Sequence, residues 1–489
     1  MRRALPALLC LSIALHAWAT NANAAPSADD LKKAQQLIER HYYESAATLL
    51  RAGDAQADGA PALLLGRAYL RDAELYRALQ RSSLAIGSRY LQKLAAQRGR
   101  DRSRYALLYY GEYLLESGKT EAGLAQLRKF LAQPGLTAGA REIARLRIAG
   151  ARAGAPTPPK AAGAQPEAIA VYAWLLSRSP AKLGEAVERV DRLADDAHRQ
   201  AAPLPMRAVS CAIAVYARAG AFDKAFTLID ASDLGRPSLV ENIGKEKVLR
   251  FYDPALLGAL AELHQGAGQR LLERAGADPR LKPVADYFVA EGRFVAGDAA
   301  GAATLLARLV AASGLPQAYR DRAAVLKAAI EARAAKGKAG SQALGELAAR
   351  HGEDPVMLAE VLFACLRAGA DCGAVADAAR RLAETGQAER FRPLHWAVGE
   401  RYAGAKQYET ALLELETARD KSNKNRIDSN DPLLLNLLAD LYLETRSFSE
   451  NLEIYFELAK EFPAVRQLQE AGQGVYSTEY RSAGDVKIF

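Results

Sequence analysis

The chain carries many residue types that enzymes use, but they do not stand at catalytic spacings. Its six histidines are scattered, and none lies four residues from another, so the HExxH zinc motif is absent. The sequence also lacks a GxSxG nucleophile turn and a GxxxxGK[ST] phosphate-binding loop. We therefore predict no catalytic residues, no metal site and no cofactor, and we expect a protein that is not an enzyme.

One aromatic stripe could bind a ligand. Tyr105, Tyr109 and Tyr113 repeat every four residues, so they lie on one face of a helix. Such rings can stack on sugars or on a peptide, but packing between helices is their more common use. Glu116 and Ser117 follow this stretch as the catalytic Glu-Ser pair does in exported lytic transglycosylases. The Gly-Leu-Met-Gln neighbourhood of those enzymes is missing, so a cell-wall-active enzyme is the least favoured interpretation.

The cysteines permit one disulfide bond. Cys365 and Cys372 flank a helix turn that could bring their sulfur atoms together, and the alternative is two ordinary core residues. Cys211 lies in an apolar stretch, and we expect it in the core. No CxxC pair indicates a redox motif or a structural zinc site.

The elements that carry these residues are predicted to be helices throughout. Ala, Leu, Arg, Glu and Lys dominate, and all are strong helix formers. Alternating runs of β-branched residues between turns are nearly absent, so strands lack their signal. The segment from Gly235 to Tyr252 fits no helical repeat, and we expect an irregular loop there.

Two stretches near the C-terminus share one pattern of small and aromatic residues. The first has Gly399, Tyr402, Tyr408 and Ala411, and the second has Ala439, Tyr442, Phe448 and Asn451 at the same spacings. This pattern resembles the tetratricopeptide repeat (TPR), in which two short helices pair and successive pairs stack on a shared core. The resemblance implies an all-α, right-handed α-solenoid of stacked helix hairpins. The residues expected to pack the repeats are Gly399, Tyr402, Ala411, Ala439, Tyr442 and Tyr455.

Weaker copies of the pattern recur upstream. Gly118, Gly220, Gly297 and Gly369 are expected to end helices, where glycine takes a positive φ at little cost. Leu65, Gly66 and Tyr69 begin a copy whose second helix cannot be placed from the sequence.

The TPR resemblance also implies a binding surface. In that family the first helix of each hairpin lines an inner groove, which here corresponds to Trp396 and Glu400 and, one repeat later, to Asn436, Asp440 and Glu444. This groove would present an aromatic ring with acidic and amide groups to an extended partner. The alternative is a solvated face with Trp396 packed between hairpins.

The N-terminus has the order of a cleavable signal peptide. Arg2 and Arg3 precede an apolar run of about 16 residues, short of the ~20 that span a membrane, and Ala22-Asn23-Ala24 is a small-x-small cleavage site. We expect cleavage after Ala24 and a periplasmic protein; secreted or outer-membrane-associated forms are alternatives. No later span is expected, and we expect no nucleic-acid partner.

Breaks in composition divide the chain into segments. These are a signal peptide 1–24, an N-terminal TPR-like array 25–152, an Ala/Pro-rich linker 153–166, a middle repeat region 167–333, a soft break 334–345, a C-terminal TPR array 346–465 and a tail 466–489.

The first hypothesis for function is a periplasmic TPR scaffold or adaptor. It would bind other envelope proteins during assembly or secretion of an envelope complex. The second hypothesis is a stand-alone module that binds a peptide or a polysaccharide.

Overall fold

A computed structural model provides the structure of the chain. It describes residues 26–39, 46–47, 49–50, 58–96, 101–152, 158, 165–200, 202–232, 240–243, 246–249, 254–311, 314–335, 338–385, 391–419, 431–447, 449–451 and 453–454. The predicted signal peptide and the tail 466–489 lie outside these residues, and so does Tyr455. No helix among the described residues is both long and apolar enough to cross a membrane.

The described residues fold into two compact units. Unit 1 is formed by residues 26–71 and 268–454, and unit 2 by residues 72–267. The boundaries fall inside two long helices, α4 (Gly59–Ala96) and α12 (Pro254–Ala275). Neither unit boundary coincides with the predicted linker 153–166 or with the predicted soft break 334–345. Within the soft break, α15 ends at Ala335 and α16 begins at Lys338.

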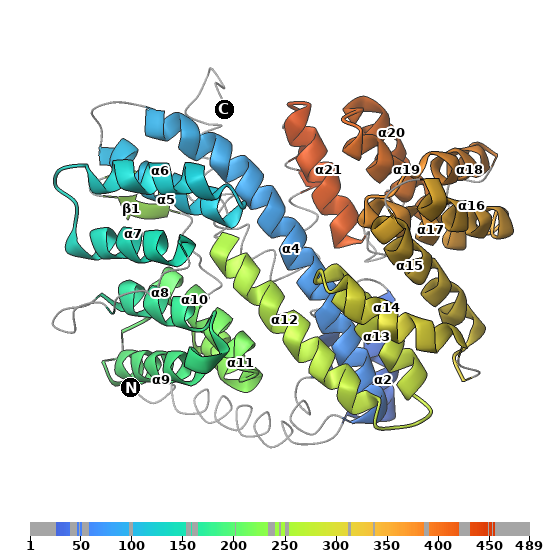
Figure 1. Cartoon of the computed structure of the whole chain (residues 1–489), viewed down its shortest axis with the longest axis horizontal. Helices are drawn as coiled ribbons and strands as arrows, with labels where there is room; N and C mark the ends of the chain where they lie inside the picture. The colour runs from blue at the N-terminus through green and yellow to red at the C-terminus, as the bar shows by residue number, and fades with distance from the viewer. Residues whose placement is uncertain are drawn as a thin grey trace, which may run out of the picture. The chain divides into compact units, whose positions relative to one another are not determined.

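Unit 1 is a stack of helices in two layers. Its further helices are α2 (Ala28–Glu39), α13 (Lys282–Val295), α14 (Ala299–Ala311), α15 (Gln317–Ala335), α16 (Lys338–Arg350), α17 (Pro355–Ala368), α18 (Gly373–Glu384), α19 (Arg392–Gly404), α20 (Tyr408–Ala418) and α21 (Pro432–Glu444). Helix α15 packs on α17, α17 on α19 and α19 on α21, while α16 packs on α18 (Figure 1). We call the row of odd-numbered helices from α13 to α21 the A layer, and the even-numbered helices from α14 to α20 the B layer.

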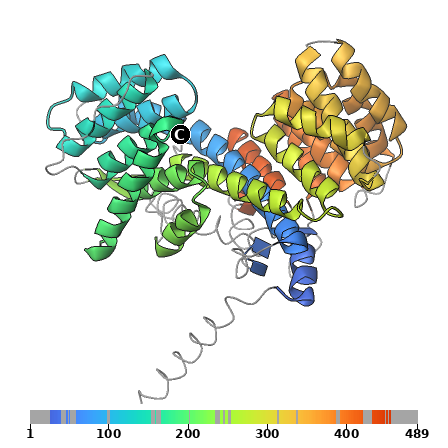
Figure 2. The same cartoon turned by 60° about the horizontal axis from the view of Figure 1, so that its bottom comes forward.

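Unit 2 also consists of paired helices. Its further helices are α5 (Asp101–Glu116), α6 (Thr120–Leu131), α7 (Ala138–Ala151), α8 (Pro166–Leu176), α9 (Leu183–Arg199), α10 (Met206–Arg218) and α11 (Phe222–Ala231), with a 3₁₀ turn at Pro180–Lys182. Helices α5 and α6 form one hairpin, α8 and α9 a second, and α10 and α11 a third (Figures 1 and 2). The prediction of stacked helix hairpins is therefore confirmed.

The helix ends follow one recurring turn. Gly118, Gly220, Gly297 and Gly369 all have positive φ, as predicted. Each donates its N–H to a carbonyl three residues back, and the next residue donates to a carbonyl five residues back, which is the Schellman motif. After α19 and α21 the same position holds Lys406 and Arg446, at φ 60° and 62°. These two residues adopt a left-handed backbone conformation that glycine takes at lower cost.

The repeat that begins at Leu65 is completed by a helix far along the chain. A Cβ built on Gly66 would lie 3.0 Å from the Gly268 carbonyl oxygen, and one on Gly268 would lie 2.9 Å from the Gly66 oxygen. The α5–α6 hairpin has the same reciprocal pair, Gly111 and Gly123. In both pairs a leucine four residues beyond the second glycine covers the first one. Helices α4 and α12 thus make one repeat whose two halves are separated by residues 72–267.

One prediction about secondary structure was wrong. Within the segment expected to be an irregular loop, β1 (Val240–Ile243) and β2 (Glu246–Leu249) pair as an antiparallel hairpin, with Val240 opposite Leu249. Strands of four residues are too short to establish an alternating pattern. The described chain is otherwise all-α.

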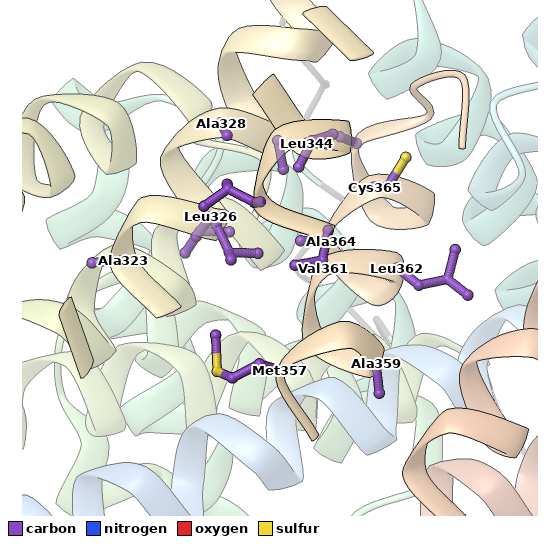
Figure 3. Close-up of a cluster of buried hydrophobic side chains, with 14 of the residues drawn as sticks. Ala323, Leu326, Ala328, Leu344, Met357, Ala359, Val361, Leu362, Ala364 and Cys365 are labelled. Atoms are coloured by element: carbon purple, nitrogen blue, oxygen red, sulfur yellow. The ribbon is translucent and has the colours of Figure 1, made fainter. Parts of the chain in front are cut away.

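The core of unit 1 runs continuously from one hairpin to the next. Figure 3 shows part of it, where Leu326 of α15, Leu344 of α16 and Met357, Val361 and Leu362 of α17 come together. The cluster joins side chains of successive hairpins, as expected where stacked hairpins share one core.

Candidate functional site

Trp396 lies in the A layer and packs against the preceding repeat. Its ring meets the Phe363 ring of α17 edge-on, with centroids 5.0 Å apart and planes at 70°. The side chain is half-buried, and its indole Nε1 makes no hydrogen bond within the described part of the chain. The indole therefore packs between successive hairpins. Binding of a partner by Trp396 stays a prediction.

The other predicted groove residues lie on the same layer with graded exposure. Glu400 is half-buried on α19. On the adjacent helix α21, Asn436 is buried, Asp440 is half-buried and Glu444 is exposed. Glu444 is thus the accessible end of this stripe, whereas Oδ1 of Asp440 is buried.

The A layer carries charges of both signs nearer its other end. Arg322 of α15 lies 3.5 Å from a carboxylate oxygen of Glu360 on α17. Burial, the largest single effect, would lower the pKa of Arg322, but Glu360, Glu291 and two nearby tyrosines together outweigh it and raise that pKa. Burial raises the pKa of the nearby Tyr287 hydroxyl well above its usual value, and Glu291 adds to the shift. The A layer therefore carries charges of both signs near α15 and α17, whereas the residues predicted to line a groove on α19 and α21 are acidic or amide groups beside Trp396.

The predicted packing residues lie where two helices approach most closely. A Cβ on Gly399 would lie 2.6 Å from Leu415 Cγ and 3.3 Å from the Ala411 carbonyl oxygen. Ala411 is fully buried, and so is Ala439, whose carbonyl accepts a 2.6 Å hydrogen bond from Asn451 Nδ2. Small residues at these positions are thus required by the close contact of paired helices.

The two predicted packing tyrosines differ in their contacts. Tyr402 packs partly buried against the core of unit 1. The Tyr442 hydroxyl donates a 2.6 Å hydrogen bond to Glu416 Oε1, and burial together with this bond raises its pKa. Tyr442 therefore ties α21 to α20 with a polar bond rather than with apolar contact alone.

Cys365 and Cys372 form a disulfide bond across the turn between α17 and α18. Their sulfur atoms are 2.13 Å apart and both residues are buried. Cys211 is buried and is not part of a disulfide bond. Among the described residues, no group of three or more His, Cys, Asp or Glu side chains could hold a metal ion.

The three tyrosines of the stripe in unit 2 have two kinds of contact. Tyr105 packs on Phe130, with ring centroids 5.8 Å apart. Tyr109 and Tyr113 are buried and line a cavity, which Glu116 also lines. The sequence indicated the tyrosine stripe but not the cavity, because the charged residues around it come from four helices and each has the spacing of a solvated face.

Paired helices in two layers, glycine or alanine at the closest contacts and Schellman turns at the helix ends define a helical-repeat fold of the TPR type. No protein-family model matches the chain, and no curated protein sequence matches it. Among solved structures, the chain is similar to yeast Tom70, at 12% identity over 93% of this chain and 96% of that chain, with a TM-score of 0.32. It is also similar to a human IFIT1 dimer with m7Gppp-AAAA, at 14% identity over 85% and 96%, with a TM-score of 0.26. A third similar structure is the maize pentatricopeptide repeat protein PPR10, at 15% identity over 98% and 74%, with a TM-score of 0.24. The fold assignment rests on the helix packing described above.

Proposed function

We propose that the chain is an exported scaffold or adaptor that binds a protein partner along the A layer of unit 1. The observation that carries this proposal is the row of adjacent helices from α15 to α21, which places Trp396, Glu400, Asp440 and Glu444 on neighbouring helices. An extended segment could contact several repeats at once, because successive helices of the row are adjacent and carry polar groups.

A periplasmic role in assembly or secretion of an envelope complex is the finer part of the proposal. It is supported by the predicted signal peptide and by the Cys365–Cys372 disulfide, since disulfides persist in oxidising compartments and are rare in the cytosol. Fusion of residues 1–30 to a reporter enzyme that is active only outside the cytoplasm tests the compartment. An inactive fusion would contradict export.

The partner surface is tested with a double variant, Trp396→Ala with Glu400→Lys, in pull-downs from envelope extracts. We expect capture of the bound protein to fall about tenfold, as when one anchor residue of an interface is lost. The matched control is Leu413→Ala with Glu409→Lys, which likewise removes one large apolar side chain and reverses one charge, at exposed positions of the B-layer helix α20. Circular dichroism should show equal helicity for both variants. Equal loss of capture in the two variants, or loss in the control alone, would contradict the assignment of the A layer.

A further inference from the structure

Unit 2 contains a cavity of about 140 Å³ that is distinct from the A layer of unit 1. Its walls come from α5, α7, α8 and α10, and the first turns of α12 form a further side. A space of this size holds several water molecules or one small polar ring. All of its lining residues lie within 72–267, so the cavity belongs to unit 2 alone.

Two arginines and two glutamates at the more buried part of the cavity form ion pairs with one another. Arg207 of α10 donates to Glu112 Oε1, and Arg147 of α7 donates a 2.5 Å hydrogen bond to Glu116 Oε1. Arg147 also lies 3.7 Å from Glu112 through its Nε. The Arg147 side chain is 10% exposed, and the two carboxylates outweigh the effect of burial and raise its pKa. Two arginines and two glutamates give a formal charge of zero.

This network leaves hydrogen-bonding capacity open. Within the described residues, hydrogen bonds reach only the Oε1 atom of Glu112 and of Glu116, so each Oε2 can accept from a bound molecule. Arg147 Nε makes no hydrogen bond within the same residues, but it is buried, so the two glutamates carry the open capacity. Nearer the mouth, Arg218 donates to Ser177 and pairs with Glu262 at 3.0 Å. Acceptor-only and donor-only side chains thus alternate along the wall.

Aromatic rings supply the apolar part of the lining. Tyr109, Tyr113 and Trp174 all face the cavity. The Arg147 guanidinium lies 4.8 Å from the centre of the Trp174 ring, and that of Arg218 lies 5.7 Å from it. The indole is therefore held in place by cation–π contacts with residues of the same network.

We propose that this cavity binds a neutral sugar unit, which is a function beyond the protein partner proposed for unit 1. A hydroxyl group both donates and accepts, so adjacent sugar hydroxyls match a wall where carboxylates alternate with guanidiniums. An anion would face two glutamates and a cation would face two arginines, so the zero net charge favours a neutral ligand. The apolar face of a sugar ring can pack on the aromatic side chains.

Trp174 can report binding directly. The chain has three tryptophans, so Trp18→Phe with Trp396→Phe leaves Trp174 as the only indole. We would titrate this variant with glucose, galactose, mannose, N-acetylglucosamine, cellohexaose and chitohexaose, and with glucuronate and triglycine for comparison. At least one neutral sugar should give a saturable change in fluorescence, with glucuronate and triglycine at least about tenfold weaker. A hexasaccharide that binds more tightly than its monomer identifies a polymer as the source, and equal affinity identifies a free sugar. No saturable change with any neutral sugar, or tighter binding of glucuronate or triglycine, would overturn the proposal.

Two variants connect binding to the network. Glu116→Gln and Glu262→Gln should each weaken sugar binding about tenfold, because each removes a charged hydrogen-bond acceptor. Glu185→Gln is the control, since Glu185 pairs with Arg189 on the exposed face of α9 in the same unit. Glu262 is 45% exposed, so its replacement leaves the fold intact even if that of Glu116 does not. Unchanged affinity in folded Glu262→Gln and Glu116→Gln would show that the network only holds the helices together.

Discussion

Replacing Gly399 by alanine tests the repeat packing most directly. The new methyl group would lie 2.6 Å from Cγ and 2.8 Å from Cδ2 of Leu415, a fully buried side chain with no open space to move into. Overpacking of this kind costs about 1–3 kcal/mol. Alanine is a better helix former than glycine by about 1 kcal/mol, which opposes that cost. We therefore expect Gly399→Ala to lower the free energy of unfolding by up to about 2 kcal/mol, and Gly399→Leu by several.

The same change at Gly345 provides the matched control. Gly345 lies in the middle of α16 in the same unit, and an added Cβ would have no atom within 4 Å. Here only helix propensity acts, so Gly345→Ala should raise the free energy of unfolding by about 0.5–1 kcal/mol. Urea unfolding followed by far-ultraviolet circular dichroism measures both variants. A Gly399→Ala variant as stable as Gly345→Ala would refute the close helix contact.

Three further predictions concern helix ends, the disulfide and a buried hydroxyl. Lys406→Gly should raise the melting temperature, because it relieves a left-handed conformation worth about 1 kcal/mol; no change would contradict the turn at φ 60°. Reduction of the Cys365–Cys372 disulfide should lower the free energy of unfolding by about 2.5 kcal/mol. Mass spectrometry should show that neither cysteine is alkylated before reduction and that both are alkylated after it. Burial and then the hydrogen bond to Asp191 raise the pKa of Tyr216 above 10.0, so the native state retains this proton when the unfolded chain loses it. Stability from this group is therefore complete below about pH 10 and falls at higher pH, and Tyr216→Phe should lose less stability than wild type between about pH 8 and pH 11; an equal loss would contradict the shift.

The sequence predicted the features that depend on neighbouring residues. Gly399 and Ala411 are twelve residues apart, so one hairpin brings them together and their spacing is visible along the chain. Gly118 and Gly220 could be assigned to helix ends because a Schellman turn needs a positive φ at one position.

Apart from the short β1–β2 hairpin, the features that were not predicted depend on distant segments. The partner of Gly66 is Gly268, and nothing near Gly66 indicates it. The charged lining of the unit 2 cavity was missed for the same reason, because Glu112, Arg147 and Arg207 come from three helices. Each of them alone has the pattern of a solvated helix face, and only the packing of α5, α7 and α10 shows that they neutralise one another.

The pairing of α4 with α12 also sets an order of events during synthesis. In most hairpins only a few residues join the two helices, whereas the partner of Gly66 is synthesised about 200 residues later. At roughly 5–20 residues per second, the apolar side of α4 stays uncovered for about 10–40 seconds. During this time a holding chaperone could bind the uncovered side of α4. A chain that ends before α12 would leave α4 without its partner helix.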